Sequence, residues 1–144
     1  TKFVYKSQQI YPYGLDVSNK KSVENFLKNI HFSEKIKFFD IIIDDGSHIL
    51  SHQLKALNYF FKHTKKKGFY IIEDYKFPEY FSHLNDVSEP TIPKIIKSIT
   101  DEQNINSNIL DEEIQNKLNK NNLNIYEHKG QKDISDILFL EKLY

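Results

Sequence analysis

Cysteine and arginine are absent from this sequence of 144 residues. Without cysteine the chain has no disulfide, no thiolate zinc site and no cysteine nucleophile, which fits a reducing, cytoplasmic compartment. Because all 20 basic residues are lysine, the bidentate guanidinium fork that favours guanine edges and phosphates is missing. No apolar run approaches the roughly 18 residues that a membrane-spanning helix needs. The composition therefore predicts a protein without a nucleic-acid partner and without a membrane span.

Charge and length are consistent with an ordinary folded domain. The 20 basic residues balance 20 acidic ones, and the sequence pI is near 7.0, so the basic stripe typical of nucleic-acid binders is absent. Aromatic residues make up 14% of the chain, which is too many for a disordered segment. A chain of about 150 residues buries roughly 68–70% of its unfolded surface. We therefore expect a single domain over residues 1–144.

Two short apolar runs flank a helical pattern in the first half of the sequence. The run 38–43 is largely apolar and β-branched, which predicts a strand buried on both faces, as in a parallel sheet. A second run, 69–72, follows Gly68. Between the two runs we expect a helix with Ser47 as its N-cap and Lys65–Gly68 as its cationic end and stop. Strand, helix and strand within about 35 residues predict a βαβ unit.

The flanking segments extend the alternation of helices and strands. We expect a strand over 10–17, which Pro12 weakens, and then a helix capped by Ser18 or Asn19. An aromatic, irregular loop is expected over 75–93. The sequence further predicts helices over 93–99 and 109–118 and a final hairpin with strands 123–127 and 134–140. This order predicts an α/β domain.

Four carboxylates follow the two central strands. Asp44 and Asp45 come at the end of the first strand, and Glu73 and Asp74 at the end of the second. Parallel strands open their carboxyl ends onto the same edge of a sheet, where ligands bind in such folds. Crowded like charges are costly unless a cation relieves them, and Mg²⁺ takes oxygen ligands. The alternative is that one carboxylate of each pair caps a helix and the other faces solvent.

Two histidines lie close to these carboxylates. His48 is expected at the N-terminus of the helix, where the helix dipole favours a neutral imidazole able to accept a proton. The alternative for His48 is a residue of the first turn without a catalytic role. His52 follows one turn later, but the segment lacks the glutamate of zinc metalloproteases, so His52 is expected to be a hydrogen-bonded residue of the helix face. Ser47 lacks the Gly-x-Ser-x-Gly frame of a hydrolase nucleophile.

Asp16 ends the strand expected over 10–17. Its carboxylate could accept a hydrogen bond from an adenine amine or a ribose hydroxyl. An N-cap for the helix that follows is an equally good interpretation of this residue.

The segment 39–48, then His52, then 68–74 resembles class I S-adenosylmethionine-dependent methyltransferases. Within that class it is similar to the metal-dependent sugar O-methyltransferases of macrolide pathways, the macrocin and mycinamicin type, and to their cephalosporin-hydroxylase-named relatives. The strong match covers roughly residues 38–75, and 10–27 matches more loosely. The resemblance implies a Rossmann-like sheet, an S-adenosylmethionine cofactor, Mg²⁺, a sugar or glycoside acceptor and a role in glycan biosynthesis.

The resemblance also implies roles for individual residues. Asp45, Glu73 and Asp74 would hold Mg²⁺, and His48 would be the general base. Asp16 would lie near the adenine end of the cofactor. Asp44 is the second residue expected to bind the cofactor. The aromatic loop 75–81 would form a wall of the acceptor pocket, or would simply pack as a long loop does. A homo-oligomer is compatible with this interpretation.

Several features depart from the class I pattern. The four glycines include no Gly-x-Gly pair, although the cofactor loop after the first strand of the class needs one. In this alignment the chain begins near the third strand. We therefore expect a class I sheet that lacks its first two strands and ends in an antiparallel hairpin, as the C-terminal portion of a methyltransferase domain. The alternative is a non-catalytic binding module derived from a truncated methyltransferase fold. A third interpretation, a metal-dependent hydrolase, is less favoured because the sequence has no recognisable nucleophile.

Overall fold

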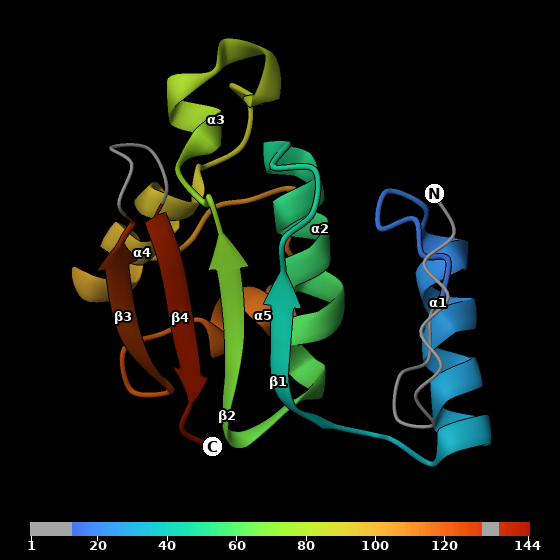
Figure 1. The fold of residues 1–144 in the computed structure, drawn as a ribbon. Coiled ribbons are helices and arrows are strands. Elements are labelled where there is room, and N and C mark those ends of the chain that lie inside the picture. Colours follow the sequence, from blue (N-terminus) through green and yellow to red (C-terminus); the bar gives the residue numbers. More distant parts are fainter. Residues whose placement is uncertain (1–12, 131–135) are drawn as a thin grey trace.

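The computed structural model describes residues 13–130 and 136–144, and these form a four-stranded mixed sheet with helices (Figure 1). The strands lie in the order β1-β2-β4-β3. Short 3₁₀ or π turns follow α1, α2 and α3. The helices and strands are α1 (Lys20–Asn29), β1 (Phe39–Asp44), α2 (Leu50–Phe60), β2 (Thr64–Glu73), α3 (Phe77–Tyr80), α4 (Ile92–Thr100), α5 (Glu112–Lys117), β3 (Leu123–Lys129) and β4 (Asp136–Lys142).

The predicted βαβ unit is confirmed. β1 and β2 pair in parallel with Ile42 opposite Tyr70, and α2 connects them. Helix α2 begins at Leu50, and its N-cap residue Ile49 makes no side-chain capping bond. The prediction that Ser47 caps this helix is therefore wrong.

The lysine-rich segment before Gly68 belongs to β2 and not to the end of α2, so that prediction is also wrong. Strand pairing accounts for the difference. The register shifts from Phe39 opposite Thr64 to Ile41 opposite Phe69, so the lysines form a bulge. Asp40 on β1 contacts the bulge through an exposed ion pair with Lys65, at 2.8 Å. Pairing with the neighbouring strand thus outweighs the local pattern of a helix end.

The predicted C-terminal hairpin is confirmed. β3 and β4 pair antiparallel, with Tyr126 opposite Phe139, and β4 also pairs antiparallel with β2. The second strand was expected over 134–140. It extends to Lys142, and its expected first residue Ile134 lies outside the described residues. The α/β fold with a terminal antiparallel hairpin is therefore the observed one.

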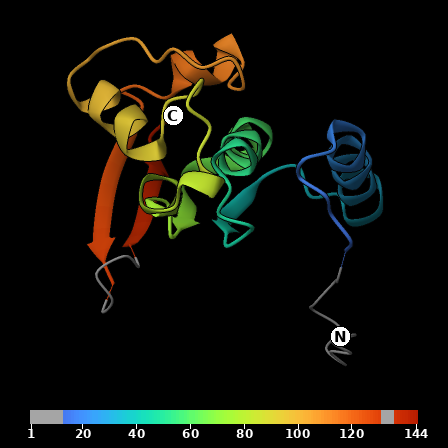
Figure 2. The same ribbon diagram turned by 90° about the horizontal axis from the view of Figure 1, so that it is seen from above.

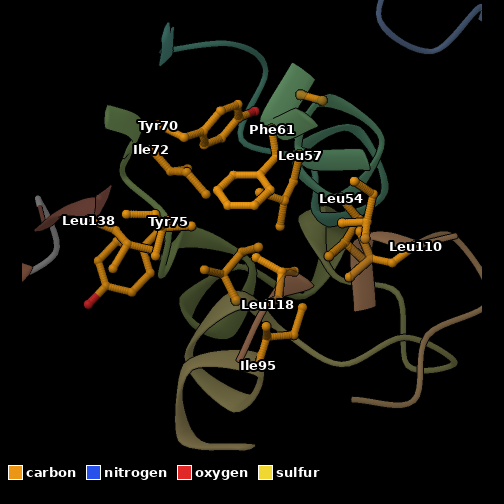
Figure 3. Close-up of a cluster of buried hydrophobic side chains, with 14 of the residues drawn as sticks. Leu54, Leu57, Phe61, Tyr70, Ile72, Tyr75, Ile95, Leu110, Leu118 and Leu138 are labelled. Atoms are coloured by element: carbon orange, nitrogen blue, oxygen red, sulfur yellow. The ribbon is translucent and has the colours of Figure 1, made fainter. Parts of the chain in front are cut away.

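The main core lies between the sheet and helices α2, α4 and α5, which cover one face of the strands (Figures 2 and 3). Every second residue of β4 is buried, and Tyr70 and Ile72 of β2 are fully buried beneath α2. Burying one such side chain stabilises the fold by about 1.5–3 kcal/mol. The opposite face differs, because Ile41 and Ile43 are 56% and 59% exposed. The prediction that this strand is buried on both faces is therefore wrong for the described residues.

Helix α1 lies beyond the β1 edge of the sheet (Figures 1 and 2). Its N-cap is Asn19, whose side chain accepts hydrogen bonds from two backbone N–H groups, and Ser18 is not the cap. Phe26 of α1 packs edge-to-face on Phe60 of α2, with ring centroids 6.1 Å apart. The strand expected over 10–17 is not formed by its described part, residues 13–17, and the rest of it lies outside the described residues.

The segments after β2 follow the predictions in part. Pro93 lies in the first turn of α4, as expected. The segment 75–93 was expected to be irregular, but it contains α3 and a 3₁₀ turn. Helix α5 is shorter than the predicted 109–118 because the backbone of Asp111 is not helical, with ψ of 151°, so that the helix begins only at Glu112. Within the part of the chain that the structure describes, no helix is long and apolar enough to cross a membrane.

Candidate active site

The carboxyl ends of β1 and β2 lie side by side at one edge of the sheet (Figure 1). Their register places Asp44 opposite Ile72, so that Asp45 and Asp74 follow the two strands at the same edge. This is the edge at which ligands bind in parallel α/β sheets. The sequence predicted this convergence, and the structure confirms it for these residues.

His48 lies between the two carboxylates. Its Nε2 atom is 3.9 Å from Asp45 Oδ1 and 3.9 Å from Asp74 Oδ2. Both distances are too long for a hydrogen bond. His48 and Asp74 have left-handed backbone conformations, with φ of 56° and 50°, which non-glycine residues adopt at a cost and often at functional sites. The backbone thus holds the imidazole and two carboxylates together at the edge of the sheet.

Asp44 turns inward from the same edge. Burial raises its pKa to about 6, although a hydrogen bond from the backbone N–H of Gly46 opposes the shift. Its Oδ2 atom is buried and has no hydrogen-bond partner among the described residues. The hydroxyl of Tyr70 is also buried without a partner, and burial, reinforced by Asp44, raises the pKa of Tyr70 well above its ordinary value.

These two side chains line a cavity of about 460 Å³. Its wall is mostly apolar and includes Val17, Phe26 and Phe60. Such a cavity, apolar with a few unpartnered polar groups, has the character of a small-molecule site. The sequence indicated Asp44 for the cofactor side but gave no sign of Tyr70, whose strand position marks it only as a core residue.

Asp16 lies apart from the other predicted site residues. Its neighbours Leu15 and Val17 line the cavity, but Asp16 itself is exposed. Its Oδ1 atom accepts hydrogen bonds from the backbone N–H and the hydroxyl of Ser18, at 2.9 and 2.7 Å, and these bonds lower the pKa of Asp16. The alternative that Asp16 caps α1 is wrong, because Asn19 is the cap.

Glu73 is the predicted metal ligand for which the described residues show no contact with His48. It is the last residue of β2 and follows the buried Ile72, so its side chain points to the opposite face of the sheet. Among the described residues no three His, Asp or Glu side chains meet as a group able to hold a metal ion. The structure thus brings together Asp45, His48 and Asp74 and leaves Glu73 beside them.

His52 has the structural role that its sequence position suggested. Its Nδ1 atom and the Ser47 hydroxyl are joined by a hydrogen bond of 2.7 Å. This bond ties the loop that carries His48 to the first turn of α2. His52 is therefore a positioning residue on the helix face.

An aromatic side chain that the sequence did not single out completes the site. The ring of Phe77 in α3 packs against the His48 imidazole, with centroids 5.1 Å apart, and Phe81 packs in turn on Phe77. Both belong to the aromatic loop that was expected either to wall an acceptor pocket or simply to pack. The path of the chain after β2 brings Phe77 to His48. The aromatic composition of the segment therefore indicated a loop near the site, but not the contact between Phe77 and His48.

No family model matches the sequence, but curated relatives do. The chain is 35% identical over 74 residues to mycinamicin VI 2''-O-methyltransferase from Micromonospora griseorubida. This match covers 43% of the chain and 18% of the relative. It is 37% identical over 68 residues to demethylmacrocin O-methyltransferase from Streptomyces fradiae. That match covers 44% of this chain and 17% of the relative. A shorter match is 53% identical over 36 residues to L-olivosyl-oleandolide 3-O-methyltransferase from Streptomyces antibioticus. It covers 25% of this chain and 9% of that relative.

Solved structures agree with these matches. The MycE methyltransferase of the mycinamycin pathway, in complex with Mg and SAH, superposes with a TM-score of 0.56 at 24% identity, covering 88% of this chain and 30% of that one. A second MycE structure, with Mg, SAH and mycinamycin VI, gives a TM-score of 0.52 at 27% identity, covering 82% and 29%. The predicted resemblance to sugar O-methyltransferases of macrolide pathways is confirmed, and so is the fold. The chain spans less than a fifth of the length of the curated relatives it matches.

Proposed function

We propose that this chain carries the metal and base residues of an S-adenosylmethionine-dependent, Mg²⁺-assisted sugar O-methyltransferase. The observation that carries the proposal is the placement of His48 Nε2 at 3.9 Å from carboxylates that follow two different parallel strands. The similarity to macrolide sugar methyltransferases supports the same reaction class.

Asp45 and Asp74, with Glu73 beside them, are the residues that would hold Mg²⁺. The donor set fits this ion, because it consists of carboxylate oxygens at an exposed edge where water can complete the coordination. When bound, Mg²⁺ lowers the pKa of a hydroxyl that it ligates, and S-adenosylmethionine supplies a methyl group on a sulfonium centre.

His48 would act as the general base. Its Nε2 atom receives the proton of the sugar hydroxyl, and the carboxylates of Asp45 and Asp74 offset the positive charge that the ring gains. Phe77 packs on the imidazole and limits its rotation. The left-handed backbone at His48 fixes the direction from which the ring approaches the acceptor.

The cofactor would occupy the cavity beside β1. Asp44 and Tyr70 are among the residues that line that cavity, and their unpartnered polar atoms are buried behind its wall. Asp16, at the rim, would lie near its adenine end. Cytoplasmic location and assembly into a homo-oligomer belong to the same proposal.

A non-catalytic binding module derived from this fold is the second candidate. The sequence contains only four glycines and no Gly-x-Gly pair. The described residues include no preformed three-ligand metal group. Both observations favour a chain that binds without turning over.

Calorimetric titration with S-adenosylmethionine, with and without Mg²⁺, separates the two candidates. The proposal predicts binding of both ligands, with Asp45→Asn weakening the metal titration and the matched variant Asp101→Asn, exposed at the end of α4, leaving it unchanged. Binding of neither ligand would overturn the proposal and favour the binding module.

The role of His48 has its own readout. His48→Ala should leave cofactor affinity nearly unchanged and reduce methyl transfer by about 10²–10⁴-fold, the usual loss when a general base is removed. Undiminished turnover in this variant would remove His48 from the reaction.

A further inference from the structure

Two chain segments meet at the end of the sheet opposite the candidate active site. They are the connection from α1 to β1 and the connection from α2 to β2 (Figure 1). His63, in the second connection, donates a hydrogen bond of 3.3 Å from its Nδ1 atom to the carbonyl oxygen of Lys37, in the first. Phe39 also pairs with Thr64 where the two strands begin. The two connections therefore form one continuous surface.

This surface is basic. Across residues 31–40 and 61–68 the sequence has six lysines and two acidic residues, Glu34 and Asp40, which leaves four excess positive charges. Asp40 is paired with Lys65, and Glu141 of β4 offsets part of the charge of Lys67. All six lysines are exposed: Lys35, Lys37, Lys62, Lys65, Lys66 and Lys67. We call the surface that they form the lysine edge.

The four carboxylates of the candidate active site do not cancel this charge. They follow the other ends of β1 and β2. Strand β1 has six residues, so about 17 Å separate its two ends at a rise of about 3.3 Å per residue. The Debye length at physiological ionic strength is only about 8 Å. An anionic surface is therefore attracted to the lysine edge and repelled by the opposite end of the strands.

Apolar side chains lie between the lysines of the first connection. Phe32 is 78% exposed, Phe38 is 44% exposed and Ile36 is 39% exposed. Lysine and apolar residues alternate over 35–38, and Lys37 Nζ lies 5.7 Å from the centroid of the Phe38 ring. Surfaces of this composition bind membranes peripherally, because lysines attract anionic head groups while aromatic and aliphatic side chains enter the boundary with the acyl chains.

A lipid surface fits the lysine edge better than a nucleic acid does. The chain has no arginine, the residue that makes bidentate contacts with phosphates and base edges. The exposed Ile36 offers no ring on which a base could stack. A bilayer accepts aliphatic and aromatic side chains alike, and it needs from lysine only a charge and no fixed geometry.

We propose that the lysine edge docks on a bilayer surface that contains anionic lipids, with Phe32 and Phe38 inserted among the head groups. Strands β1 and β2 run from this edge to the candidate active site (Figure 1). Docking therefore points the carboxyl ends of the strands away from the bilayer and leaves the site open to the aqueous phase. The docking does not rest on the proposed function.

Cosedimentation with phospholipid vesicles, without Mg²⁺ or cofactor, tests the proposal. We expect the protein to sediment with vesicles of phosphatidylcholine that contain about 30 mol% phosphatidylglycerol, because the anionic lipid supplies the attraction. With phosphatidylcholine alone it should stay in the supernatant. Raising NaCl from about 0.1 M to about 0.5 M should release the bound protein. Absence of binding to the anionic vesicles, or equal binding to both kinds, overturns the proposal.

Two double variants of equal charge locate the binding surface. Lys37→Gln with Lys66→Gln removes one charge from each connection and should weaken vesicle binding about 25-fold, since each lysine near an anionic surface contributes about fivefold. Lys94→Gln with Lys97→Gln removes the same charge from exposed positions of α4 and should change binding less than about twofold. Equal losses in the two double variants would overturn the proposal.

The role of Phe32 separates a lipid surface from other polyanions. Phe32→Ala should weaken vesicle binding about tenfold through the lost apolar contact. Val87→Ala, at a residue that is 100% exposed in the segment after α3, should leave binding unchanged. Undiminished binding by Phe32→Ala, or release of the vesicles by an equal charge of poly(U) RNA, would make the lysine edge a general polyanion site and overturn the proposal.

Discussion

At the level of single residues, the carboxyl end of β1 combines groups that are unfavourable for stability. Asp44 is held in a partly buried position with one oxygen unpartnered, and His48 has a strained backbone. Residues of this kind persist where the surrounding structure over-determines them, and they cluster at functional sites. We interpret the strain here as the cost of holding a cofactor and metal edge.

The pH dependence of stability follows from Asp44. Burial raises its pKa from 3.8 to about 6, so the folded state holds a proton that the unfolded chain releases between these values. The stability that protonated Asp44 contributes is complete below about pH 4 and is lost as the pH rises to about 6. At about 1.4 kcal/mol per pKa unit, the loss is roughly 2–3 kcal/mol.

Urea unfolding of the parent and of Asp44→Asn, in chelator, checks this prediction. The free-energy difference between the two proteins should grow in favour of the variant from pH 4 to pH 6 and stay constant above. Parallel pH profiles would show that Asp44 is not desolvated in the fold.

The site residues divide into those that the sequence could indicate and those that it could not. Asp45, His48 and Asp74 follow strands whose parallel pairing is predictable, so their convergence at one edge was predictable too. Tyr70 and Phe77 reach the site through burial and through the path of α3. Neither has a local signal, because an aromatic residue in a strand or loop is equally typical of core packing.

At the level of elements, Gly68 fixes how β2 approaches β1. A Cβ atom at this position would lie 2.6 Å from the backbone oxygen of Asp40 and 3.0 Å from that of Lys65. Both obstacles are backbone atoms, so the strands themselves would have to separate at the bulge. The glycine is required here by close approach.

Gly68→Ala should therefore lower the free energy of unfolding by about 1–3 kcal/mol, as overpacking does. Gly14→Ala is the matched control, because nothing lies within 4 Å of its added methyl group, and it should change stability by less than about 0.5 kcal/mol. Equal unfolding midpoints for the two variants in denaturant would contradict the observed packing of the bulge.

The same region shows where element prediction fails. The run Lys65–Gly68 has the composition of a helix end, and only the pairing of the β2 backbone with β1, on both sides of the bulge, makes it part of the strand. The hairpin was predictable because two strand-like runs flank a polar turn near Lys129-Gly130-Gln131. Which residues of β4 are buried was not, because Ile137–Leu140 is a continuous apolar run in which only the structure shows alternate burial.

At the level of the whole molecule, the sheet is covered unevenly. Helices α2, α4 and α5 pack on one face (Figure 2), whereas Ile41 and Ile43 are exposed on the other. The continuous apolar run of β1 predicted burial on both faces. The sequence pattern shows which side chains of β1 are apolar. It does not show whether another element packs on each face of the strand.

We propose that Asp45 and Asp74, with Glu73 beside them, bind a hard divalent cation next to His48. Mn²⁺, which takes the same oxygen ligands as Mg²⁺, broadens the NMR signals of nearby residues, so a Mn²⁺ titration locates the site directly. The account predicts broadening centred on 45–48 and 73–75 that excess Mg²⁺ reverses and that Asp45→Asn weakens. Broadening centred elsewhere, or unchanged in that variant, would contradict it.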